Sequence, residues 1–489
     1  MNNGEDAVIV LGGGLAGLSA GYVLAKAGVR VKIFESDSMV GGLSKTLIHN
    51  GFRFDLGGHR FFTTDENVNA FVKNLMGSEL ISVCRKSKIY MRNQYIDYPL
   101  RPFNAVFSLG LPVTLKIIGD YGIEKVKSLV RKKEDISLED WVVRHFGRTM
   151  FNMYFKEYSE KVWGMECGGI SAEWVEQRIR GLSLAKAIRN AFFRFAGKDM
   201  PTLVDSFLYP RLGIGRISDR LKEEIVKNND VYISTSVERV NHSDFTVDSI
   251  VAGSNTHKEV IPGKEFISSI PLPKLVGILN PAPPENILAA ASRLKFRDLI
   301  VVAIMIDRRR VTDQTWIYVP ERNMPFGRIH EPTNWSEEMA PEGKTIMVME
   351  FFSFRGDRIW NESDEGLVDL TVANLEQLGF IASNEVIDSA VVRVPKAYPL
   401  FEVGYRNICR EIHQYLSRFK NLHITGRGGM FRYYNMDHAI ESGVGSAERV
   451  LKKAARVGKI EWCPCNDVPV IREAVPITGD EGIALLRVQ

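Results

Sequence analysis

The N-terminal part of the chain alternates two short apolar runs with one stretch of helical period. Residues 8–11 are continuously apolar, which is typical of a strand buried on both faces of a parallel sheet. A glycine-rich turn follows, then apolar residues at helical spacing, then a second apolar run that ends at Glu35. The pattern of residues 7–35 therefore predicts a strand, a turn, a helix and a second strand.

Beyond this stretch the period of the apolar residues changes twice. Residues 80–91 predict one strand, and residues 95–102 predict a turn into a new region. From residue 103 to about 198 the spacing is helical nearly throughout, with helix starts expected at Ser137 and Ser171, each followed by acidic residues. This region predicts a helical insertion in an α/β protein.

The second half of the chain returns mainly to strands. An amphipathic helix over 216–227 precedes two predicted strands, 231–240 and 245–251, and the apolar residues 265–270 predict a strand that rejoins the first sheet. Between residues 281 and 400, strand-like runs flank one long helix, which favours a substrate-facing sheet. We expect its strands at 299–307, 315–319, 345–352 and 390–394, its helix at 366–378, a last buried strand at 421–427 and a closing helix over 436–457.

These elements predict an α/β fold with three parts. A Rossmann-type nucleotide-binding domain is assembled from three segments, and it carries a helical insertion and a mixed β-sheet substrate domain. A chain of 489 residues is also too long for one simple core. We expect the nucleotide-binding domain at 1–95, 205–275 and 415–457, the helical insertion at 96–204, the substrate domain at 276–414 and a C-terminal extension at 458–489.

Three glycines open the first predicted helix in the spacing G-x-G-x-x-G. Gly12 allows the tight turn, Gly14 lets the backbone approach a pyrophosphate, and Gly17 lets the helix lie close to the strand. The free N–H groups of the helix N-terminus then point at the phosphates. Glu35 ends the second strand where a carboxylate can accept hydrogen bonds from a ribose hydroxyl. The stretch predicts a dinucleotide site, with a mere glycine-rich turn as the alternative.

Two further glycine pairs decide between the common dinucleotides. The pair Gly41-Gly42 suits a loop that passes over a pyrophosphate, and the pair Gly57-Gly58 lets backbone lie against a flat ring. Neither is expected in a plain nicotinamide dehydrogenase. With the glycine fingerprint, this spacing resembles the FAD-binding flavoproteins of the amine oxidase and protoporphyrinogen oxidase type. The resemblance implies FAD as the cofactor and a Rossmann-type FAD-binding domain.

Composition excludes some functions. The chain is 45% hydrophobic and 25% charged, as in ordinary globular proteins, and its formal net charge of +4 does not favour nucleic acid as a partner. Five cysteines are few and unpatterned, which favours a reducing, cytoplasmic location. Cys463 and Cys465 form a C-x-C without a second cluster, so we predict no metal site. The polar N-terminus does not resemble a signal peptide.

The apolar residues 103–118 form the longest hydrophobic stretch. Pro112 and Lys116 interrupt it, so it is too short to span a membrane. We interpret its helical stripe as core, with contact to a membrane surface as the alternative, and the same alternative applies to the basic aromatic residues 187–198.

Arginines and tyrosines recur in three clusters outside the glycine motif. Two separated arginines, Arg178 and Arg328, can grip the negative charges of a nucleoside diphosphate bidentately. Tyrosines can each donate one hydrogen bond to a phosphate oxygen and offer a ring wall to a sugar or base. We therefore expect the substrate to contact Tyr158, Ser159, Trp163, Arg178, Arg328, Tyr398, Tyr433 and Asn435. Taken singly, each of these side chains could equally be a surface residue or a core filler.

The order of these motifs resembles the UDP-galactopyranose mutase family over residues 7–450. The shared features are the Y-S-x-K-x-W-G that starts at Tyr158, the R-I at Arg178, the R-I at Arg328, a Y-P at Tyr398, and a G-R-x5-Y-Y-N-M that contains Arg427. The chain departs at Glu157, where the motif has glycine, and at Asn435, where the galactose enzymes have aspartate. The chain is also longer than the short bacterial mutases, and its helical region differs. The change at Asn435 and this extra length concern the sugar more than the reaction.

That resemblance implies a mechanism and its residues. Reduced flavin N5 attacks the anomeric carbon, the diphosphate leaves, and the sugar ring reopens and recloses between pyranose and furanose without net redox change. His59 lies beside the flavin ring, although a backbone-bonded core histidine is equally consistent, and it joins Arg178 and Arg328 as the catalytic set. The implied FAD contacts are Gly12, Gly14, Leu15, Ala16, Gly17, Glu35, Ser36, Gly42, Leu43, Gly58, His59, Val237, Arg427 and Met436.

Two other functions stay open at this point. A redox flavoenzyme of the amine oxidase or protoporphyrinogen oxidase type would oxidise an amine, porphyrinogen or polyene, and the apolar residues 103–118 favour it. A flavin-stabilised scaffold without activity is the third interpretation. The substrate expected of the first function is a nucleoside-diphosphate sugar for polysaccharide assembly. An external reductant such as NADPH would dock at the flavin itself because no second nucleotide fingerprint is present, and we expect a homo-oligomer.

Overall fold

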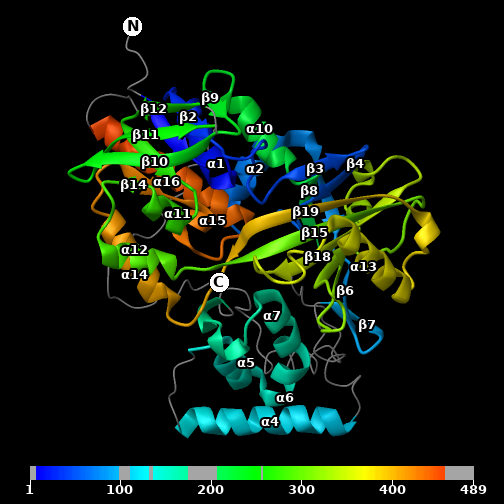
Figure 1. Cartoon of the computed structure of the whole chain (residues 1–489). Helices are drawn as coiled ribbons and strands as arrows, with labels where there is room; N and C mark the ends of the chain where they lie inside the picture. The colour runs from blue at the N-terminus through cyan, green and yellow to red at the C-terminus, as the bar shows by residue number, and fades with distance from the viewer. Residues whose placement is uncertain (1–6, 99–110, 131–135, 175–205, 255–256, 457–489) are drawn as a thin grey trace.

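The computed structural model describes residues 7–98, 111–130, 136–174, 206–254 and 257–456. Within these ranges the first layer is a five-stranded parallel sheet in the order β20-β13-β1-β2-β9. Its strands come from both ends of the chain, so the nucleotide-binding layer is assembled from separate segments as predicted (Figure 1). The strands are β1 (Val8–Leu11), β2 (Val31–Phe34), β9 (Asp230–Tyr232), β13 (Glu265–Ser268) and β20 (Leu422–Ile424).

Two long helices pack together beside this sheet. Helix α1 (Leu15–Lys26) starts directly after the glycine turn, and α16 (Met436–Arg456) lies against it. Close approach needs glycine twice: a Cβ on Gly17 would lie 2.0 Å from the Gly12 carbonyl oxygen, and one on Gly443 would lie 2.1 Å from the Ala16 carbonyl oxygen. The remaining helices of this half are α2 (Glu66–Met76), α10 (Arg216–Ile225), α11 (Leu272–Gly277), α12 (Glu285–Ser292), α14 (Tyr405–Leu416) and α15 (Gly426–Met430).

A four-stranded sheet corrects one prediction. The apolar run 231–240 is not one strand, because the chain turns at Ser234, whose φ of 52° is left-handed. Its first part is β9 of the parallel sheet, and its second part begins a separate sheet in the order β12-β11-β10-β14 within the described residues. These strands are β10 (Ser236–Ser243), β11 (Thr246–Gly253), β12 (Lys258–Pro262) and β14 (Leu279–Asn280).

A sheet is present where the substrate-facing sheet was predicted. Two of its strands, β6 and β7, come from residues far away in the sequence. In the described part of the chain it has seven strands in the order β19-β15-β18-β17-β16-β6-β7, and α13 (Asp364–Gln377) packs on it. The predicted boundary at residue 95 does not separate the two sheets, since β6 lies before it and β7 spans it. Its strands are β6 (Ser87–Met91), β7 (Gln94–Tyr98), β15 (Phe296–Ile306), β16 (Trp316–Tyr318), β17 (Arg328–His330), β18 (Thr345–Ser353) and β19 (Val386–Pro399).

Two predictions near this edge were wrong. Residues 80–91 form two strands in different sheets, β5 (Leu80–Cys84), which pairs with β8 (Ser206–Pro210), and β6, and the break falls at the charged pair Arg85-Lys86. Residues 94–98 are strand rather than turn. The turn lies earlier, at Arg92 and Asn93, which both have positive φ. A two-stranded hairpin of β3 (Thr46–His49) and β4 (Phe52–Asp55) completes the described strands.

The helical insertion forms a separate layer at one end of the molecule (Figure 1). Residues 99–110, 131–135 and 175–205 of the predicted insertion lie outside the described residues, as does the predicted extension 458–489. No helix in the described ranges is both long enough and apolar enough to cross a membrane. The helices of this layer are α4 (Leu111–Val130), α5 (Leu138–Phe146), α6 (Arg148–Met150) and α7 (Lys156–Trp163), and Ser137 caps α5 as predicted.

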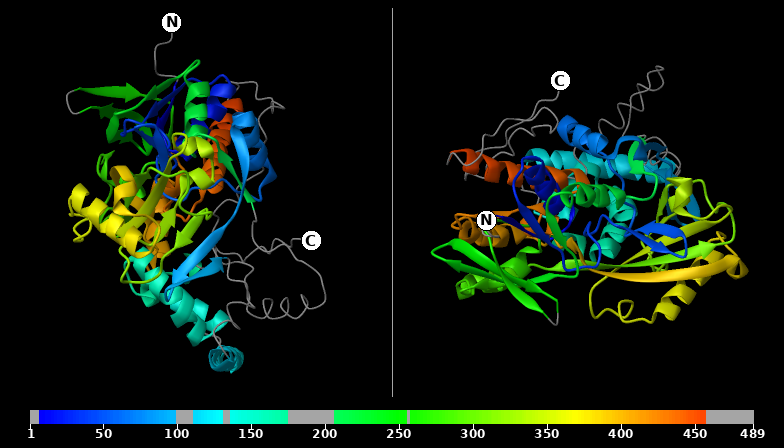
Figure 2. Two further views of the ribbon diagram at one scale, coloured as in Figure 1. Left: turned by 90° about the vertical axis from the view of Figure 1, so that its right-hand side faces the viewer. Right: turned by 90° about the horizontal axis from the view of Figure 1, so that it is seen from above.

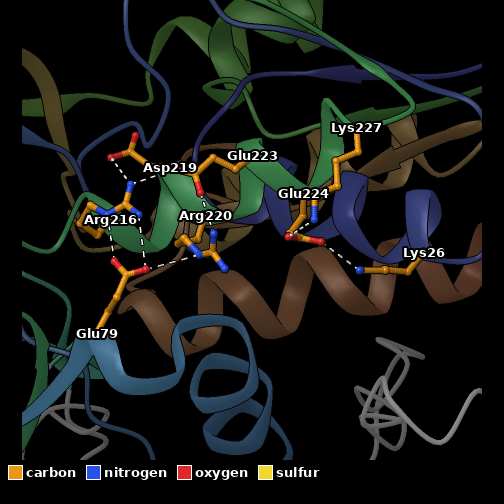
Figure 3. Close-up of polar contacts among 8 residues, drawn as sticks. All are labelled: Lys26, Glu79, Arg216, Asp219, Arg220, Glu223, Glu224 and Lys227. Carbon is orange, nitrogen blue, oxygen red and sulfur yellow. Dashed lines mark hydrogen bonds and ion pairs between the residues drawn. The ribbon is translucent and has the colours of Figure 1, made fainter.

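An ion-pair network joins α10 to its neighbours (Figure 3). Glu79, at the end of the segment that follows α2, accepts from Arg216 at 3.0 Å and lies 3.5 Å from Arg220. On the other side, Glu224 lies 3.0 Å from Lys26 of α1. Several shared charges make a network more stabilising than isolated surface pairs.

We expect Glu79→Gln to lower the free energy of unfolding by about 1 kcal/mol at low salt, and by less at high salt, because screening weakens exposed ion pairs. Urea unfolding at two salt concentrations measures this. Glu337→Gln is the matched control, since among the described residues Glu337 forms an ion pair with Arg309 alone, at 3.5 Å, and both side chains are largely exposed. Equal effects of the two substitutions would contradict a special role for the network.

Candidate functional site

A cavity of about 1120 Å³ lies between the parallel sheet, the seven-stranded sheet and the helical layer. Its volume is at the upper end of small-molecule sites, as a dinucleotide with a further ligand would require. Most residues predicted from the sequence meet in its wall: Gly14, Leu15, Ala16, Glu35, Ser36, Gly42, Leu43, Gly58, His59, Tyr158, Ser159, Trp163, Arg328, Tyr398, Tyr433, Asn435, Arg427 and Met436.

One end of the cavity is formed by the glycine turn and the start of α1. A Cβ added to Gly14 would meet only the Gly42 Cα, at 3.9 Å, so the backbone here faces open space. Glu35 also borders the cavity, and its carboxylate accepts hydrogen bonds from the N–H groups of Gly13 at 2.7 Å and Asp37 at 2.8 Å. This end therefore presents a helix N-terminus and an anchored carboxylate to a ligand.

Helix α7 supplies the tyrosine and tryptophan at the other end. Lys161, part of the motif that singled out this helix, does not face the cavity. Its ammonium donates to the carbonyl oxygens of Val319 at 2.8 Å, Glu321 at 2.8 Å and Phe326 at 2.7 Å. Burial lowers the pKa of Lys161 to about 7. The lysine thus fixes α7 to the loops around β16, which positions Tyr158, Ser159 and Trp163.

A second buried cation fixes the C-terminal end of α7. Arg297 of β15 donates to the carbonyl oxygens of Val162 at 3.0 Å and Phe352 at 2.8 Å. Trp163, next in the chain, is buried and packs edge-to-face against Trp174 at 5.1 Å between ring centroids. Sequence reasoning did not single out Arg297, and a charged residue at the start of a continuously apolar strand was the available signal.

The arginine predicted for diphosphate binding forms an ion pair on its sheet. Arg328 of β17 stands opposite Tyr318 of β16 on one side and Glu350 of β18 on the other. A guanidinium nitrogen of Arg328 lies 3.3 Å from Glu350 Oε1, and the same oxygen accepts from Gly58 N–H at 3.0 Å. Burial disfavours both charges and raises the pKa of Glu350, but the Glu350 carboxylate holds the pKa of Arg328 well above its usual value.

Arg427 also lines the cavity, close to two tyrosines. Its guanidinium carbon is 4.8 Å from the ring centroid of Tyr398 and 5.3 Å from that of Tyr433. Burial raises the pKa of Tyr398 to about 12, so its hydroxyl keeps its proton and can donate a hydrogen bond. Asn435 and Met436 follow at the N-terminus of α16, which also borders the cavity.

Comparison with known proteins identifies the family. Residues 15–451 match the family described as flavin containing amine oxidoreductase. The chain belongs to this family. It is therefore a flavin amine oxidoreductase-family enzyme, and the family implies a flavin cofactor. The observed α/β architecture agrees with the predicted fold class.

Individual relatives of this flavoprotein carry two kinds of name, oxidase and mutase. Protoporphyrinogen oxidase 2 of Arabidopsis thaliana is 22% identical, over 91% of this chain and 93% of the relative. A probable UDP-galactopyranose mutase of Klebsiella pneumoniae is 26% identical, over 34% of this chain and 42% of the relative. Among solved structures, reduced UDP-galactopyranose mutase superposes with a TM-score of 0.77 at 22% identity, covering 92% of this chain and 94% of that chain. At that identity the likeness concerns the fold.

The residues around the cavity fit a flavin. In the described part of the chain, the buried nitrogens of cavity-lining residues that have no hydrogen-bond partner include Nδ1 of His59, Nε of Arg328 and Nε1 of Trp163. Buried polar atoms are seldom left unpaired, so they indicate a ligand with polar edges. Gly58 borders the same place, beside Arg328. The backbone of Gly58 would leave room for a flat heteroaromatic ring at this wall.

Two histidines near Arg328, His59 and His330, are neutral. Burial, with the charges of Arg427 and Arg328, lowers the pKa of His59 to about 4. Burial, with the charge of Arg328, lowers the pKa of His330 to about 3, and the His330 ring stacks on Trp335 at 5.3 Å. His59 is thus an uncharged hydrogen-bonding group at neutral pH, not a cation.

These histidines predict acid lability. The folded protein binds their protons less readily than the unfolded chain, so the stabilisation is complete above about pH 6.5 and is lost as the pH falls toward 4. The free energy of unfolding of the wild type should fall between pH 7.5 and pH 5. We expect this fall to be about 2 kcal/mol smaller in His330→Phe, which keeps a ring against Trp335. Urea unfolding at both pH values measures the difference. His257→Phe, at a largely exposed position, is the control, and parallel losses in all three proteins would contradict the prediction.

A few predicted residues do not line the cavity. Gly12 and Gly17 shape the turn beneath it, and Val237 is buried in β10 of the four-stranded sheet. Arg178 lies outside the described residues. Conversely, sequence reasoning missed Glu350 and Tyr318. An isolated acid within the apolar strand β18 was a usable signal for Glu350, whereas nothing local distinguished Tyr318.

Proposed function

We propose that this enzyme uses FAD and interconverts the pyranose and furanose forms of a nucleoside-diphosphate sugar. The observation that carries the proposal is that two partly buried arginines, Arg328 and Arg427, lie with three tyrosines in the wall of one cavity. Such a cluster is suited to an anion with many acceptor oxygens, which two guanidinium groups and three hydroxyl groups can contact together.

The chain's residues would divide the work as follows. Bound in the reduced state, the flavin would supply the nucleophile for the anomeric carbon. Arg328 would grip the diphosphate, and the ion pair with Glu350 holds its guanidinium in the wall of the cavity. Tyr158, Tyr398 and Tyr433 would donate hydrogen bonds to phosphate oxygens. The neutral His59 would form a hydrogen bond with the flavin ring through its Nδ1.

In this reaction the side chains of the protein would bind and orient the substrate rather than transfer protons. The tasks are to hold the departing diphosphate near the sugar and to exclude water, which together keep the reaction reversible. Arg427, with its guanidinium near the rings of Tyr398 and Tyr433, would contribute positive charge that stabilises a reduced, anionic flavin in the cavity. The N-terminus of α16 adds a helix dipole of the same sign.

The main competing function is oxidation of an apolar or amine substrate. The long match to the plant protoporphyrinogen oxidase favours it, because that relative covers more of the chain than the probable mutase does. The two functions differ in the oxidation state of flavin that supports turnover, which makes them experimentally separable.

The deciding experiment begins with the purified protein and the spectrum of its flavin. The flavin is reduced anaerobically with dithionite or NADPH, and a panel of nucleoside-diphosphate pyranoses is added. We expect furanose formation only with the reduced enzyme. If no sugar reacts and the oxidised enzyme consumes oxygen or quinone with an amine, porphyrinogen or polyene, the oxidase function replaces the proposed one.

A further inference from the structure

Helix α4 forms the outer end of the helical layer. It lies farthest from the parallel sheet in Figure 1, and the left view of Figure 2 shows it end-on at the same extremity. One side of the helix packs on α5 and α6. Ile117 is fully buried there, and the Asp120 carboxylate accepts from the backbone N–H of Thr149 at 3.0 Å. The helix is therefore anchored by its inner side.

The opposite side of α4 exposes large apolar side chains. Leu115 is 61% exposed, Ile118 45%, Ile123 54% and Val126 62%. At 3.6 residues per turn these positions form one continuous stripe, and the exposed Gly119 and Gly122 lie between them. The interpretation of residues 103–118 as core was thus wrong for Leu115 and Ile118. Contiguous exposed apolar surface of this kind marks an interaction site.

Lysines border this stripe on both flanks. Lys125 lies on one edge, with its ammonium 5.3 Å from the Tyr121 ring centroid, and Lys116 and Lys127 lie on the other edge. All three are exposed. The two acids of the described helix are turned away from the stripe: Asp120 is bonded to the neighbouring helix, and Glu124 lies 2.7 Å from Lys127. The outward side of α4 is consequently apolar in the middle and positive at both edges.

We propose that α4 docks the protein peripherally on an anionic lipid surface. An apolar stripe flanked by lysines matches the interface between acyl chains and negative headgroups, because long lysine side chains reach the headgroups while the stripe enters the apolar layer. A second copy of the chain fits less well. Two α4 helices packed stripe to stripe would bring lysine edges against lysine edges, and like charges oppose such a contact.

The test uses the full-length protein and sedimentation with vesicles. One set of vesicles is phosphatidylcholine alone, and the other is a mixture of phosphatidylcholine and phosphatidylglycerol. We expect stronger binding to the anionic vesicles, weakened by salt. Ile123→Glu with Val126→Glu should reduce binding by about tenfold or more per side chain, because each loses the free energy of apolar burial and gains a repelled charge.

Two controls separate docking from misfolding. Val260→Glu changes an equally exposed apolar residue on β12, 67% exposed, and should bind vesicles like the wild type. Lys116→Gln with Lys125→Gln should lose the preference for anionic vesicles while circular dichroism stays unchanged. Absence of vesicle binding by the wild type overturns the proposal. So does lipid-free dimerisation that Ile123→Glu with Val126→Glu abolishes, because the stripe would then be an interface between copies.

Discussion

Replacing Arg328 by alanine is expected to lower the rate of pyranose–furanose interconversion by about 100- to 1000-fold, the usual cost of removing one strong donor from a reacting anion. The guanidinium lines the cavity and lies 3.3 Å from Glu350, so it is oriented before any substrate arrives. The measurement is the initial rate with the dithionite-reduced enzyme and the sugar nucleotide that the panel identifies.

The same substitution is also expected to destabilise the fold, and this effect needs its own control. Without Arg328 the fully buried Glu350 loses its counter-charge, which costs about 3 kcal/mol. Arg328→Ala combined with Glu350→Gln removes both charges and should recover most of this stability without recovering activity. Arg328→Lys should keep stability but lose the bidentate grip on the diphosphate. Full activity in the double variant would show that Arg328 acts only on folding.

Gly14 and Gly17 lie three positions apart in one turn, but their replacement by alanine is expected to have different effects. Gly14→Ala should affect flavin binding, and Gly17→Ala should affect the stability of the fold as well. At Gly14 a Cβ would meet no protein atom closer than 3.9 Å, so the fold tolerates it, but the methyl group borders the cavity where a pyrophosphate would lie. We expect the purified Gly14→Ala protein to contain about tenfold less flavin, and the flavin-free variant to unfold at the same urea concentration as the flavin-free wild type.

At Gly17 the added Cβ would lie 2.0 Å from the Gly12 carbonyl oxygen. Helix α1 would have to move away from β1, and overpacking of this severity costs about 3 kcal/mol or more. We therefore expect Gly17→Ala to lower the free energy of unfolding as well as the flavin content. Absorbance of the released flavin and urea unfolding measure the two quantities. A Gly14→Ala protein that keeps its flavin would contradict the predicted path of the cofactor over this turn.

Local spacing in the sequence was sufficient for the nucleotide-binding half. Gly12 has a φ of 100°, and a Cβ on Gly17 would lie 2.0 Å from the Gly12 carbonyl oxygen, so both positions require glycine and the turn is recognisable without the rest of the chain. The long helices α1, α13 and α16 likewise lie where their apolar period predicted them, because one face of each must be buried. Arg328, Tyr158 and Tyr398 were also identifiable, and the structure brings them to one cavity.

Tertiary structure alone decided which polar groups face one another. Glu350 meets Arg328 because two antiparallel strands place them opposite each other, and register between strands is set by the whole sheet rather than by nearby residues. The same holds for Tyr318, which stands on the other side of Arg328. The turn at Ser234 moved half of a predicted strand into another sheet, since a left-handed residue that is not glycine has no reliable signal in the sequence.

Helix α4 shows the same difference between what the sequence predicts and what tertiary packing decides. The sequence predicted helical spacing from residue 103 to about 198, and α4 lies within this range at residues 111–130. It did not determine which apolar side is covered, because that depends on where α5 and α6 pack. Packing buried Ile117 and left Leu115, Ile118, Ile123 and Val126 exposed. Periodicity is a property of the local chain, whereas burial is a property of the neighbours that long-range folding brings to it.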